Sequence, residues 1–573
     1  MGAINLLRWS DSSPTAGAGA GLGAQTYALH SRLEHIIVGM CKRISQVAAV
    51  CALSLLVMLS SFAAAGTVRK TSLGHHAFHH NFHQRSAVQL RQTQAGKPGG
   101  SKTKPGKRHK HRKAAPITVA SVLNKLSASG QLSATAEAQY LAQWNGAIQV
   151  EHQLTGWRSQ QLSQETVLLH NMAIQGLVTA ARLPALFATL AANVSYWPSG
   201  TQLSYPDRVK IPGSELVWEY YPGSGLQLQV LGTFGEANGF YEAGPQDYPQ
   251  LTQVLAQMQA LAVPRGGGLT WEYYFPWEGG TPGWVSAMAQ GTAIEAFANA
   301  YRATGSSSYL SEAAQLLPLF TTAPPLGVGE QTALGWRYLQ YSFAPHTYII
   351  NAFLQSLIGL QSYASLGTGT GAGVGTGAGA GSSAGSGAAD GSSTSTNQSY
   401  SALPGVTSAA QLFSAGNSEA QAELPGYVLP GWSLYQPGVP DPLNYHQLVT
   451  GFIGQLCTIT RAPVYCSTYT TFSSDLRTTP VITQLTTTAS SGRTFKLAFT
   501  LSKYAKVGLI LTGAGGQTYL YTSAQFPNGT GSFMVPKLKP GSYTVTLTAT
   551  DPAGNRTQVA GTITTCRKRN CTA

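Results

Sequence analysis

Apolar side chains recur at helical spacing through the middle of the chain. One stretch has apolar residues at positions i, i+3, i+4, i+7 and i+10: Leu251, Val254, Leu255, Met258 and Leu261. This spacing is typical of a helix with one buried face. The stretches 288–301 and 310–320 repeat it, whereas 349–360 is apolar on most faces and predicts a fully buried helix. Alternating amphipathic and buried helices over 236–475 predict an α/α toroid-like domain.

A different period governs the end of the chain. From Phe495 to Leu501 and from Tyr543 to Ala549, apolar side chains occupy every second position, which indicates half-buried strands. The turn-forming sequences KPGS and DPAGN flank the last of these strands. The segment LKPGSYTVTLTATDPAGN resembles the final strands of bacterial immunoglobulin-like domains. This resemblance implies that residues 480–565 form an all-β sandwich of that kind.

Low-complexity segments separate the folded parts. Residues 67–115 are basic and His-rich, and their few apolar side chains cannot bury a core. A Gly/Ser-rich insert at 367–399 is expected to loop out of the helical domain. Short aromatic and β-branched pieces between turn signals in 200–235 predict strands and loops. The chain is thus expected to be multidomain and mainly α, with these units: leader 1–66, linker 67–115, N-terminal helical and small β region 116–235, α/α domain 236–475, immunoglobulin-like sandwich 480–565 and basic tail 566–573.

The net charge of +14 comes mostly from one segment. Between Arg69 and Lys113 the chain has twelve Lys or Arg and no acid, so removing this segment leaves a charge of about +2, from 14 − 12. The folded remainder is therefore expected to be nearly neutral. A neutral folded surface argues against a nucleic-acid partner.

The N-terminal segment has the pattern of an export signal. Lys42 and Arg43 precede an apolar run from Val47 to Ala65 that ends in small residues. A cleaved signal peptide has this pattern, and the alternative is a retained membrane anchor, since the run is nearly long enough to span a bilayer. Both alternatives predict a secreted or cell-surface protein, attached in the second case to the membrane or cell wall.

The exported part of the chain contains four cysteines in two close pairs. Cys457 lies near Cys466, and Cys566 lies near Cys571. Two local disulfides fit this arrangement in an exported protein. Zinc is the alternative, but the pairs are far apart in sequence and lack CxxC spacing. No metal or other cofactor is predicted.

Three aromatic-rich segments stand out in the helical region, where no P-loop, dinucleotide fingerprint or HExxH motif occurs. They are GWVSAMAQGTAIEAFANAY (283–301), WRYLQYSFAPHTYIINAFLQSLIGL (336–360) and WSLYQPGVPDPLNYH (432–446). Here the chain resembles the C-terminal domain of the D-glucuronyl C5-epimerases, which act on heparan-type polysaccharides. That family has W-x-SAMAQGQA, EEYP-x-x-P, VLNGF-x-x-SLIGL, T-I-Y and W-D-Y-H segments in this order. The resemblance extends over about 200–470.

The resemblance implies roles for individual residues. Tyr341 matches the tyrosine of the EEYP segment, Tyr435 that of T-I-Y, and Tyr445 with His446 the Y-H pair. In the family, tyrosines at these places are implicated in proton transfer at C5 of a uronate. The resemblance also implies an acidic polysaccharide as substrate and a homodimer as the assembly.

Three departures from the family pattern affect these roles. Gln340 stands where the family has a glutamate, Gly438 where it has an arginine and Asn444 where it has an aspartate. The first departure removes a candidate general base. The second removes a candidate clamp for the substrate carboxylate.

The chemistry sets its own requirements. C5 epimerisation removes a proton α to a carboxylate and returns one to the opposite face, so it needs an acid/base group on each face. We expect Tyr341 and Tyr445 to transfer these protons, with Tyr435 and His446 in orienting or stabilising roles. Because a phenol has a pKa of about 10, a neighbouring cation must lower it, and Arg337 and His446 are the candidates. The expected substrate-binding residues are Gln340, Arg337, Trp336, Gln290, Trp284 and Asn351.

Two other functions fit the same sequence. A uronan lyase would share the abstraction of the C5 proton, but cleavage of the C4–O bond would follow. A non-catalytic glycan-binding protein of the cell surface would tolerate the departures at Gln340 and Gly438.

Overall fold

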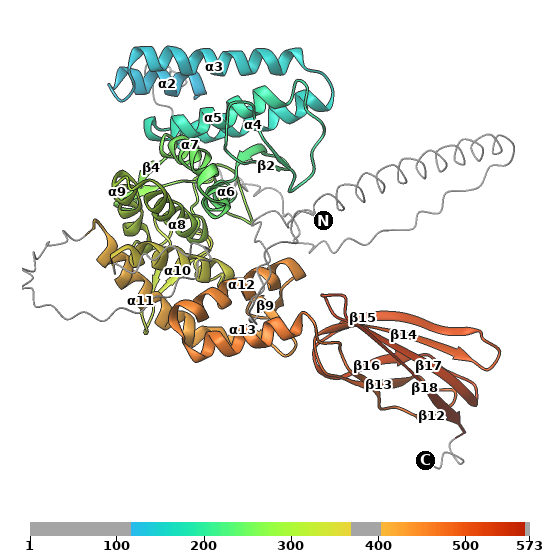
Figure 1. Cartoon of the computed structure of the whole chain (residues 1–573). Coiled ribbons are helices and arrows are strands. Elements are labelled where there is room, and N and C mark those ends of the chain that lie inside the picture. The colour runs from blue at the N-terminus through green and yellow to red at the C-terminus, as the bar shows by residue number, and fades with distance from the viewer. Residues whose placement is uncertain (1–115, 368–402, 568–573) are drawn as a thin grey trace, which may run out of the picture. The chain divides into compact units, whose positions relative to one another are not determined.

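The computed structural model describes residues 116–367 and 403–567 (Figure 1). Several predictions lie outside these residues: the leader 1–66, the linker 67–115, nearly all of the insert 367–399, and Cys571 with the end of the tail. Within the described ranges, the chain is helical up to residue 475 and strand-rich after it. The predicted combination of helices and sheets with a strand-rich C-terminal region is confirmed. The α/α toroid and the immunoglobulin-like sandwich stay predictions.

Four helices begin the described chain: α2 (Val119–Ala128), α3 (Ala134–Gln153), α4 (Trp157–Ile174) and α5 (Leu183–Tyr196). They pack against one another and form the blue and green-blue group in Figure 1. Side-chain caps fix where the first two begin. Thr118 and Ser121 form a reciprocal capping box, and the Ser133 hydroxyl accepts from the backbone N–H of Ala136 at 3.2 Å. Pro184 in the first turn of α5 needs no hydrogen-bond acceptor there.

A small antiparallel sheet follows, made of β1 (Arg208–Val209), β2 (Trp218–Tyr221) and β3 (Gly225–Leu228). Every residue of β2 and β3 is buried. The strands predicted in 200–235 are therefore present. The chain becomes helical earlier than expected, however, because the Gln229 side chain caps a helix that begins at Val230.

The central helices are α6 (Val230–Ala243), α7 (Tyr248–Gln259), α8 (Ala287–Thr304), α9 (Ser308–Leu316) and α10 (Ile350–Ala364). Two short hairpins lie between them: β4 (Val263–Arg265) with β5 (Gly268–Thr270), and β6 (Gly329–Gln331) with β7 (Trp336–Tyr338). Helix α10 is buried on nearly all faces, as its apolar sequence predicts, and it contacts α8. A Cβ on Gly359 would lie 2.0 Å from the Gly291 carbonyl oxygen, so glycine permits the close approach of these helices.

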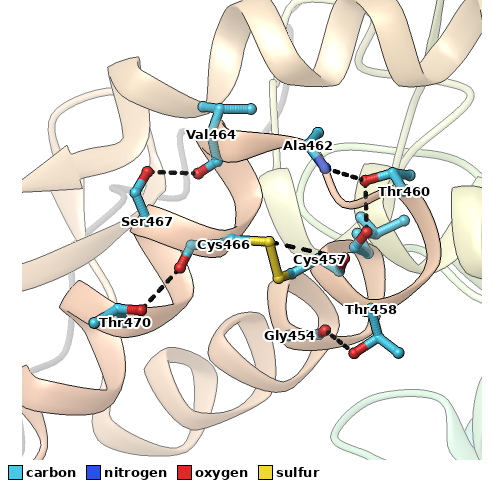
Figure 2. The surroundings of a disulfide bond; sticks show 10 residues. Gly454, Cys457, Thr458, Thr460, Ala462, Val464, Cys466, Ser467 and Thr470 are labelled. Atoms are coloured by element: carbon cyan, nitrogen blue, oxygen red, sulfur yellow. Dashed lines mark hydrogen bonds between the residues drawn. A yellow bond between two sulfur atoms is a disulfide. The ribbon is translucent and has the colours of Figure 1, made fainter.

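The helical part ends with α11 (Val406–Glu423), α12 (Leu443–Thr460) and α13 (Pro463–Asp475). A three-stranded antiparallel sheet of β8 (Val428–Leu429), β9 (Trp432–Gln436) and β10 (Val439–Pro440) precedes α12. A disulfide between Cys457 and Cys466 joins α12 to α13 (Figure 2), as predicted. Cys566 is also disulfide-bonded.

Two sheets form the C-terminal β region around a single hydrophobic core. One sheet has the order β11-β13-β16 and the other β12-β18-β17-β14-β15. Their bounds are β11 (Ile482–Gln484), β12 (Thr488–Ser490), β13 (Phe495–Leu501), β14 (Ala505–Gly513), β15 (Thr518–Phe526), β16 (Gly529–Val535), β17 (Gly541–Thr550) and β18 (Arg556–Cys566). Alternate residues of β13 and β17 face this core, which confirms the predicted period of two.

Within residues 116–367 and 403–567, none of the helices combines the length and the apolar character that a membrane crossing requires.

Candidate active site

A cavity of about 340 Å³ lies where the small sheet β1–β3 meets the helical part. Its size is in the range of small-molecule sites in proteins. Residues from well-separated stretches line it: Tyr205, Pro206, Asp207, Arg208, Glu219, Tyr221, Gln229, Leu231, Tyr273, Phe275, Trp277, Trp284, Gln340, Tyr341 and Tyr445. The wall is rich in phenols and indoles and contains a few charged groups, so it offers both flat rings and hydrogen-bond donors.

Backbone pairing with the start of α8 fixes the position of Tyr341. The Ser342 N–H donates to the Val285 carbonyl at 3.0 Å, and the Ala287 N–H donates to the Leu339 carbonyl at the same distance. The Tyr341 hydroxyl accepts from the Trp277 indole at 3.2 Å. Two of the segments singled out in the sequence therefore meet at the cavity wall, and the tyrosine is held with its hydroxyl already bonded.

The three predicted tyrosines converge. The ring centroids of Tyr435, on β9, and Tyr445, in the first turn of α12, are 5.3 Å apart in an edge-to-face contact. The hydroxyls of Tyr435 and Tyr341 interact by a hydrogen bond. Tyr341 and Tyr445 both line the cavity, whereas Tyr435 contacts Tyr445 but is not among the lining residues. This cluster joins segments that are about a hundred residues apart in sequence.

Arg208 and Glu219 form an ion pair in the wall of the cavity. The Arg208 Nε donates to Glu219 Oε2 at 2.7 Å, across the register of β1 and β2. The Glu219 side chain is only 4% exposed, whereas that of Arg208 is 26% exposed. Among the interactions of the described residues, the two terminal Nη groups of Arg208 have no hydrogen-bond partner. The guanidinium therefore keeps a planar pair of donors for a ligand carboxylate.

A hydrogen-bonded row of side chains supports Glu219. Tyr221 interacts with the Glu219 carboxylate by a hydrogen bond, and Tyr221 Oη accepts from Gln229 Nε2 at 2.9 Å. Tyr273 Oη donates to Gln229 Oε1 at 3.2 Å and accepts from the backbone N–H of Leu231 at 3.1 Å. Because every member has a partner, the row holds the carboxylate in one orientation.

The phenols of the cavity are neutral at pH 7. Burial raises the pKa of Tyr341, Tyr435 and Tyr445 above the ordinary phenol value, and the negative charge of Glu278 adds to the increase. Burial and the nearby Glu219 raise the pKa of Tyr205 to about 12. The sequence-based expectation of cations that lower these pKa values is therefore wrong. Neutral phenols are suited to donating protons rather than accepting them.

His446 lies outside the cavity lining. Its side chain is fully buried, stacks on Trp432 at 3.9 Å, and its Nδ1 is 2.7 Å from Ser433 Oγ. The Ser433 hydroxyl donates to Asp441 Oδ2 at 2.5 Å. Burial lowers the pKa of His446 to about 4, so its ring is neutral at pH 7. His446 therefore holds β9 against α12 and cannot serve as the cation beside Tyr445.

Arg337 also points elsewhere. Its Nε donates to Glu423 at 2.7 Å, and its guanidinium lies 3.6 Å from the ring centroid of Tyr348. It is absent from the residues that line the cavity, as are three other predicted substrate-binding residues: Trp336, Gln290 and Asn351. Gln290 is buried and donates to the Trp271 carbonyl at 3.1 Å. The sequence pattern that selected these residues marks buried positions as well as functional ones. It therefore could not show that these side chains pack elsewhere in the fold.

Gln340 and Trp284 line the cavity as predicted. The Gln340 Oε1 accepts from the Ser286 hydroxyl at 3.4 Å, which places the amide where the related family has a carboxylate. Gly438 lies in the exposed turn between β9 and β10 with a φ of 80°, a conformation that favours glycine over arginine. The loss of an arginine at this position therefore has a local backbone explanation.

The small sheet contributes cavity residues that the sequence pattern did not predict. Arg208, Glu219 and Tyr221 all come from 200–235, which was interpreted only as strands and loops. One signal was available: Glu219 is an acid within the aromatic stretch VWEYY, and a carboxylate on a fully buried strand needs a specific partner. In the described part of the chain, His, Cys, Asp and Glu do not gather in a group of three or more that could hold a metal ion.

Comparisons with known proteins find similarity in the central part of the chain. A family model described as the D-glucuronyl C5-epimerase C-terminus matches residues 267–474. A D-glucuronyl C5-epimerase of Caenorhabditis elegans is 40% identical over 87 residues, which are 15% of this chain and 14% of that protein. Among solved structures, the PKD domain of an M14-like peptidase from a Thermoplasmatales archaeon is 18% identical, with a TM-score of 0.13. That match covers 16% of this chain and 94% of the domain.

Proposed function

We propose that residues 267–474, which match the family model of the D-glucuronyl C5-epimerase C-terminus, form a domain of that family, and that the chain inverts C5 of uronic acid residues in an acidic polysaccharide. One observation carries the proposal. Two of the tyrosines that the family resemblance selects, Tyr341 and Tyr445, line one cavity, the third packs against Tyr445, and the same cavity contains a carboxylate and a guanidinium. An epimerase needs these groups together: a clamp for the sugar carboxylate, a base and an acid.

Arg208 is the proposed clamp. Among the described residues that line the cavity it is the single Lys or Arg, and its two Nη groups are available to the carboxylate of a uronate. A bidentate pair of this kind orients the sugar and stabilises the negative charge that develops when the proton at C5 leaves. Arg208 would then bind the substrate carboxylate in place of the arginine that the related family has at the position of Gly438.

Glu219 is the proposed base. It is a carboxylate on the cavity wall, whereas Gln340 has no basic oxygen and the phenols are neutral. When a uronate binds Arg208, the substrate carboxylate competes with Glu219 for the guanidinium, which makes Glu219 more basic. The C5–H bond then breaks, the proton goes to a Glu219 oxygen, and the electron pair moves toward the sugar carboxylate.

Tyr341 is the proposed acid on the other face of the sugar. The two groups come from different parts of the cavity wall, Glu219 from strand β2 and Tyr341 from the segment between β7 and α10. The Tyr341 phenol gives its proton to C5 and becomes a phenolate, which Tyr435 stabilises by a hydrogen bond. Glu219 then releases its proton to water and Tyr341 takes one from water, so solvent hydrogen appears at C5.

Deuterium exchange tests the function. The full chain is incubated in D2O with an unsulfated polymer of alternating glucuronic acid and N-acetylglucosamine, and C5 is followed by NMR. Deuterium at C5 with both C5 configurations present supports the epimerase. A rise in ultraviolet absorbance from an unsaturated uronate would replace it with a lyase. Binding without exchange on any uronan would leave only the glycan-binding alternative.

The assigned base has its own test. With the two C5 epimers offered separately, Glu219→Gln is expected to abolish exchange from one epimer and Tyr341→Phe exchange from the other. A purely structural role of Glu219 would lower both rates equally, and this outcome would remove it from the mechanism. Glu165→Gln is a matched control, since Glu165 is buried and bonded to Gln227 at 2.7 Å but does not line the cavity.

We also propose the finer architecture and location that the sequence suggests. Helices of 236–475 would form an α/α toroid around the cavity, and 480–565 an immunoglobulin-like sandwich. The protein would be secreted or attached to the cell surface through its N-terminal segment, and would act as a homodimer. The disulfide between Cys457 and Cys466 supports an oxidising location.

A further inference from the structure

The two folded parts of the chain have opposite charges. Residues 116–475 contain nine Lys or Arg and nineteen Asp or Glu, a net charge of −10, whereas 476–573 contain eleven Lys or Arg and one Asp, a net charge of +10. The small net charge outside the His-rich linker therefore results from two large and opposite charges, one on each folded part. The C-terminal β region is a strongly basic module attached to an acidic one.

Nearly all of this positive charge lies on the surface. In the described range 476–567, eight basic side chains belong to exposed residues: Arg477, Arg493, Lys496, Lys506, Lys537, Lys539, Arg556 and Arg567. The ninth, Lys503, is buried and pairs with Asp551 at 2.7 Å. Because Asp551 is the single acid of this range and is itself buried, no carboxylate there neutralises the exposed cations.

Backbone pairing gathers four of these cations at one end of the sheets. The Gly492 N–H donates to the Leu538 carbonyl at 2.8 Å, which brings Arg493 beside Lys537 and Lys539. The Thr565 hydroxyl donates to the Lys539 carbonyl at 2.6 Å, and the Ser491 N–H donates to the Cys566 carbonyl at 2.9 Å. These bonds add Arg567. We define Arg493, Lys537, Lys539 and Arg567 as the basic end.

Exposed tyrosine rings lie beside the basic end. The Tyr543 hydroxyl donates to the Lys539 carbonyl at 3.0 Å, and the Tyr519 ring packs edge-to-face on Tyr543 with centroids 5.1 Å apart. Tyr519 is 39% exposed, and Tyr521, two residues further along strand β15, is 79% exposed. Flat rings next to cations suit a sugar chain, because the rings cover its apolar faces and the cations pair with its carboxylates.

We propose that the basic end of the C-terminal module binds an acidic polysaccharide by its carboxylates, as a capture site separate from the cavity. The identity of this polymer as a uronan rests on the proposed function. The helical part has a net charge of −10, so it repels a polyanion at long range, and a basic module on the same chain offsets this repulsion and raises the local substrate concentration. We favour a glycan over a membrane surface or a nucleic-acid duplex, because the pyranose rings of a polysaccharide offer apolar faces on which the exposed tyrosine rings can stack.

Binding of the intact chain to an immobilised unsulfated glucuronic acid polymer tests the proposal. The triple variant Arg493→Gln, Lys537→Gln and Lys539→Gln is expected to lose at least tenfold in affinity in 50 mM salt. The affinity of the unmodified chain is expected to fall steeply as salt rises, because exposed charges are screened over about 8–10 Å at 0.10–0.15 M. Tyr521→Ala, which leaves the charge unchanged, is expected to weaken binding severalfold.

A matched variant separates a local site from net charge. Arg477→Gln, Lys506→Gln and Arg556→Gln also remove three exposed cations, but none of them belongs to the basic end. Equal losses of polymer affinity in the two triple variants would overturn the proposal. It would also be overturned if the triple variant of the basic end kept its polymer affinity but lost binding to DNA or to phosphatidylglycerol vesicles. This readout is independent of catalysis: a chain without C5 exchange that still binds through the basic end would refute only the proposed function.

The same variants connect capture to turnover. With a long polymer as substrate, loss of the basic end is expected to raise KM about tenfold in 50 mM salt and to leave kcat unchanged. With an oligosaccharide just long enough to fill the cavity, neither constant is expected to change. A fall in kcat on the short substrate would contradict the separation of the two sites.

Discussion

In the proposed mechanism, Arg208 acts both through its bond to Glu219 and through its two Nη groups. Its Nε is bonded to Glu219, and its two Nη groups have no hydrogen-bond partner among the described residues. The same side chain can therefore bind the substrate and change the basicity of the base. This coupling explains how a chain with Gln340 and Gly438 in place of acid and arginine could keep the reaction.

Arg208→Lys preserves the positive charge and removes the planar pair of donors. We expect kcat/KM to fall by about 10–100-fold, because a hydrogen bond to a charged group contributes roughly 1.5–3 kcal/mol. Steady-state kinetics on a uronate oligosaccharide gives the measurement. Arg302→Lys is the control, since Arg302 bonds to Asn299 and Ser362 away from the cavity. Similar losses in both variants would refute the clamp.

Tyr341→Phe and Tyr445→Phe each remove one hydroxyl from the cavity wall. We expect Tyr341→Phe to lower conversion between the C5 epimers by about 10²–10⁴-fold, the usual contribution of a positioned proton donor. Tyr445→Phe is expected to have a smaller effect, because Glu219 rather than Tyr445 is the proposed base and Tyr445 only lines the cavity. Circular dichroism and thermal unfolding should match the unmodified chain. Tyr248→Phe serves as the control, because Tyr248 stacks on Tyr241 outside the cavity. Full activity in either cavity variant would exclude that tyrosine.

At the scale of elements, the paired helices α8 and α10 hold the cavity wall in place. They carry the two most recognisable sequence segments, SAMAQG and SLIGL, and the glycines of these segments meet where the helices cross. A Cβ on Gly291 would lie 2.6 Å from the backbone Cα of Ser356. Part of the family pattern therefore encodes helix packing rather than chemistry.

Gly359→Ala tests this packing. The added Cβ would lie 2.0 Å from a backbone oxygen that cannot rotate away, so we expect a loss of about 1–3 kcal/mol in the free energy of unfolding. Gly239→Ala is the control: Gly239 lies within α6 with no atom within 4 Å of the new Cβ. There we expect a gain of about 0.5–1 kcal/mol, because alanine has less freedom to lose. Chemical denaturation measures both, and an unchanged Gly359→Ala variant would contradict the packing argument.

The sequence predicted the elements better than it predicted the site. The period of two in 495–501 and the apolar run at 349–360 correspond to β13 and α10, because these patterns report burial directly. Tyr341 and Tyr445 could be found because they lie in recognisable segments. Arg208 and Glu219 could not, because their partnership depends on the register of β1 and β2 and on a fold that brings this sheet to the helices. His446 was misassigned, since adjacency to Tyr445 does not reveal that its ring faces the interior.

For the whole molecule, the acidic helical part makes stability depend on pH. Burial raises the pKa of Glu295 to about 7, and a hydrogen bond from Gln355 Nε2 at 2.9 Å only partly opposes this shift. Burial also raises the pKa of Asp441 to about 6. These acids are more basic in the folded than in the unfolded chain. The stability they contribute is complete below about pH 4.5 and is lost as pH rises through their folded pKa values.

Thermal unfolding across pH checks this dependence. We expect a lower melting temperature at pH 8 than at pH 5, with Glu295 responsible for on the order of 1–3 kcal/mol, since one pKa unit corresponds to about 1.4 kcal/mol. Glu295→Gln should flatten the slope between pH 5 and 8. Glu312→Gln, on α9, should leave the slope as it is. A steeper slope in Glu295→Gln would contradict the assignment.

The opposite charges of the two folded parts also affect how copies of the chain behave together. At low ionic strength, the acidic helices of one molecule and the basic strands of another attract each other. The net charges of whole chains oppose this attraction only weakly once the charge of the His-rich segment is neutralised. Added salt weakens this mutual attraction. Concentrated solutions should therefore clear rather than cloud as sodium chloride is raised from zero, the salting-in familiar from dipolar proteins.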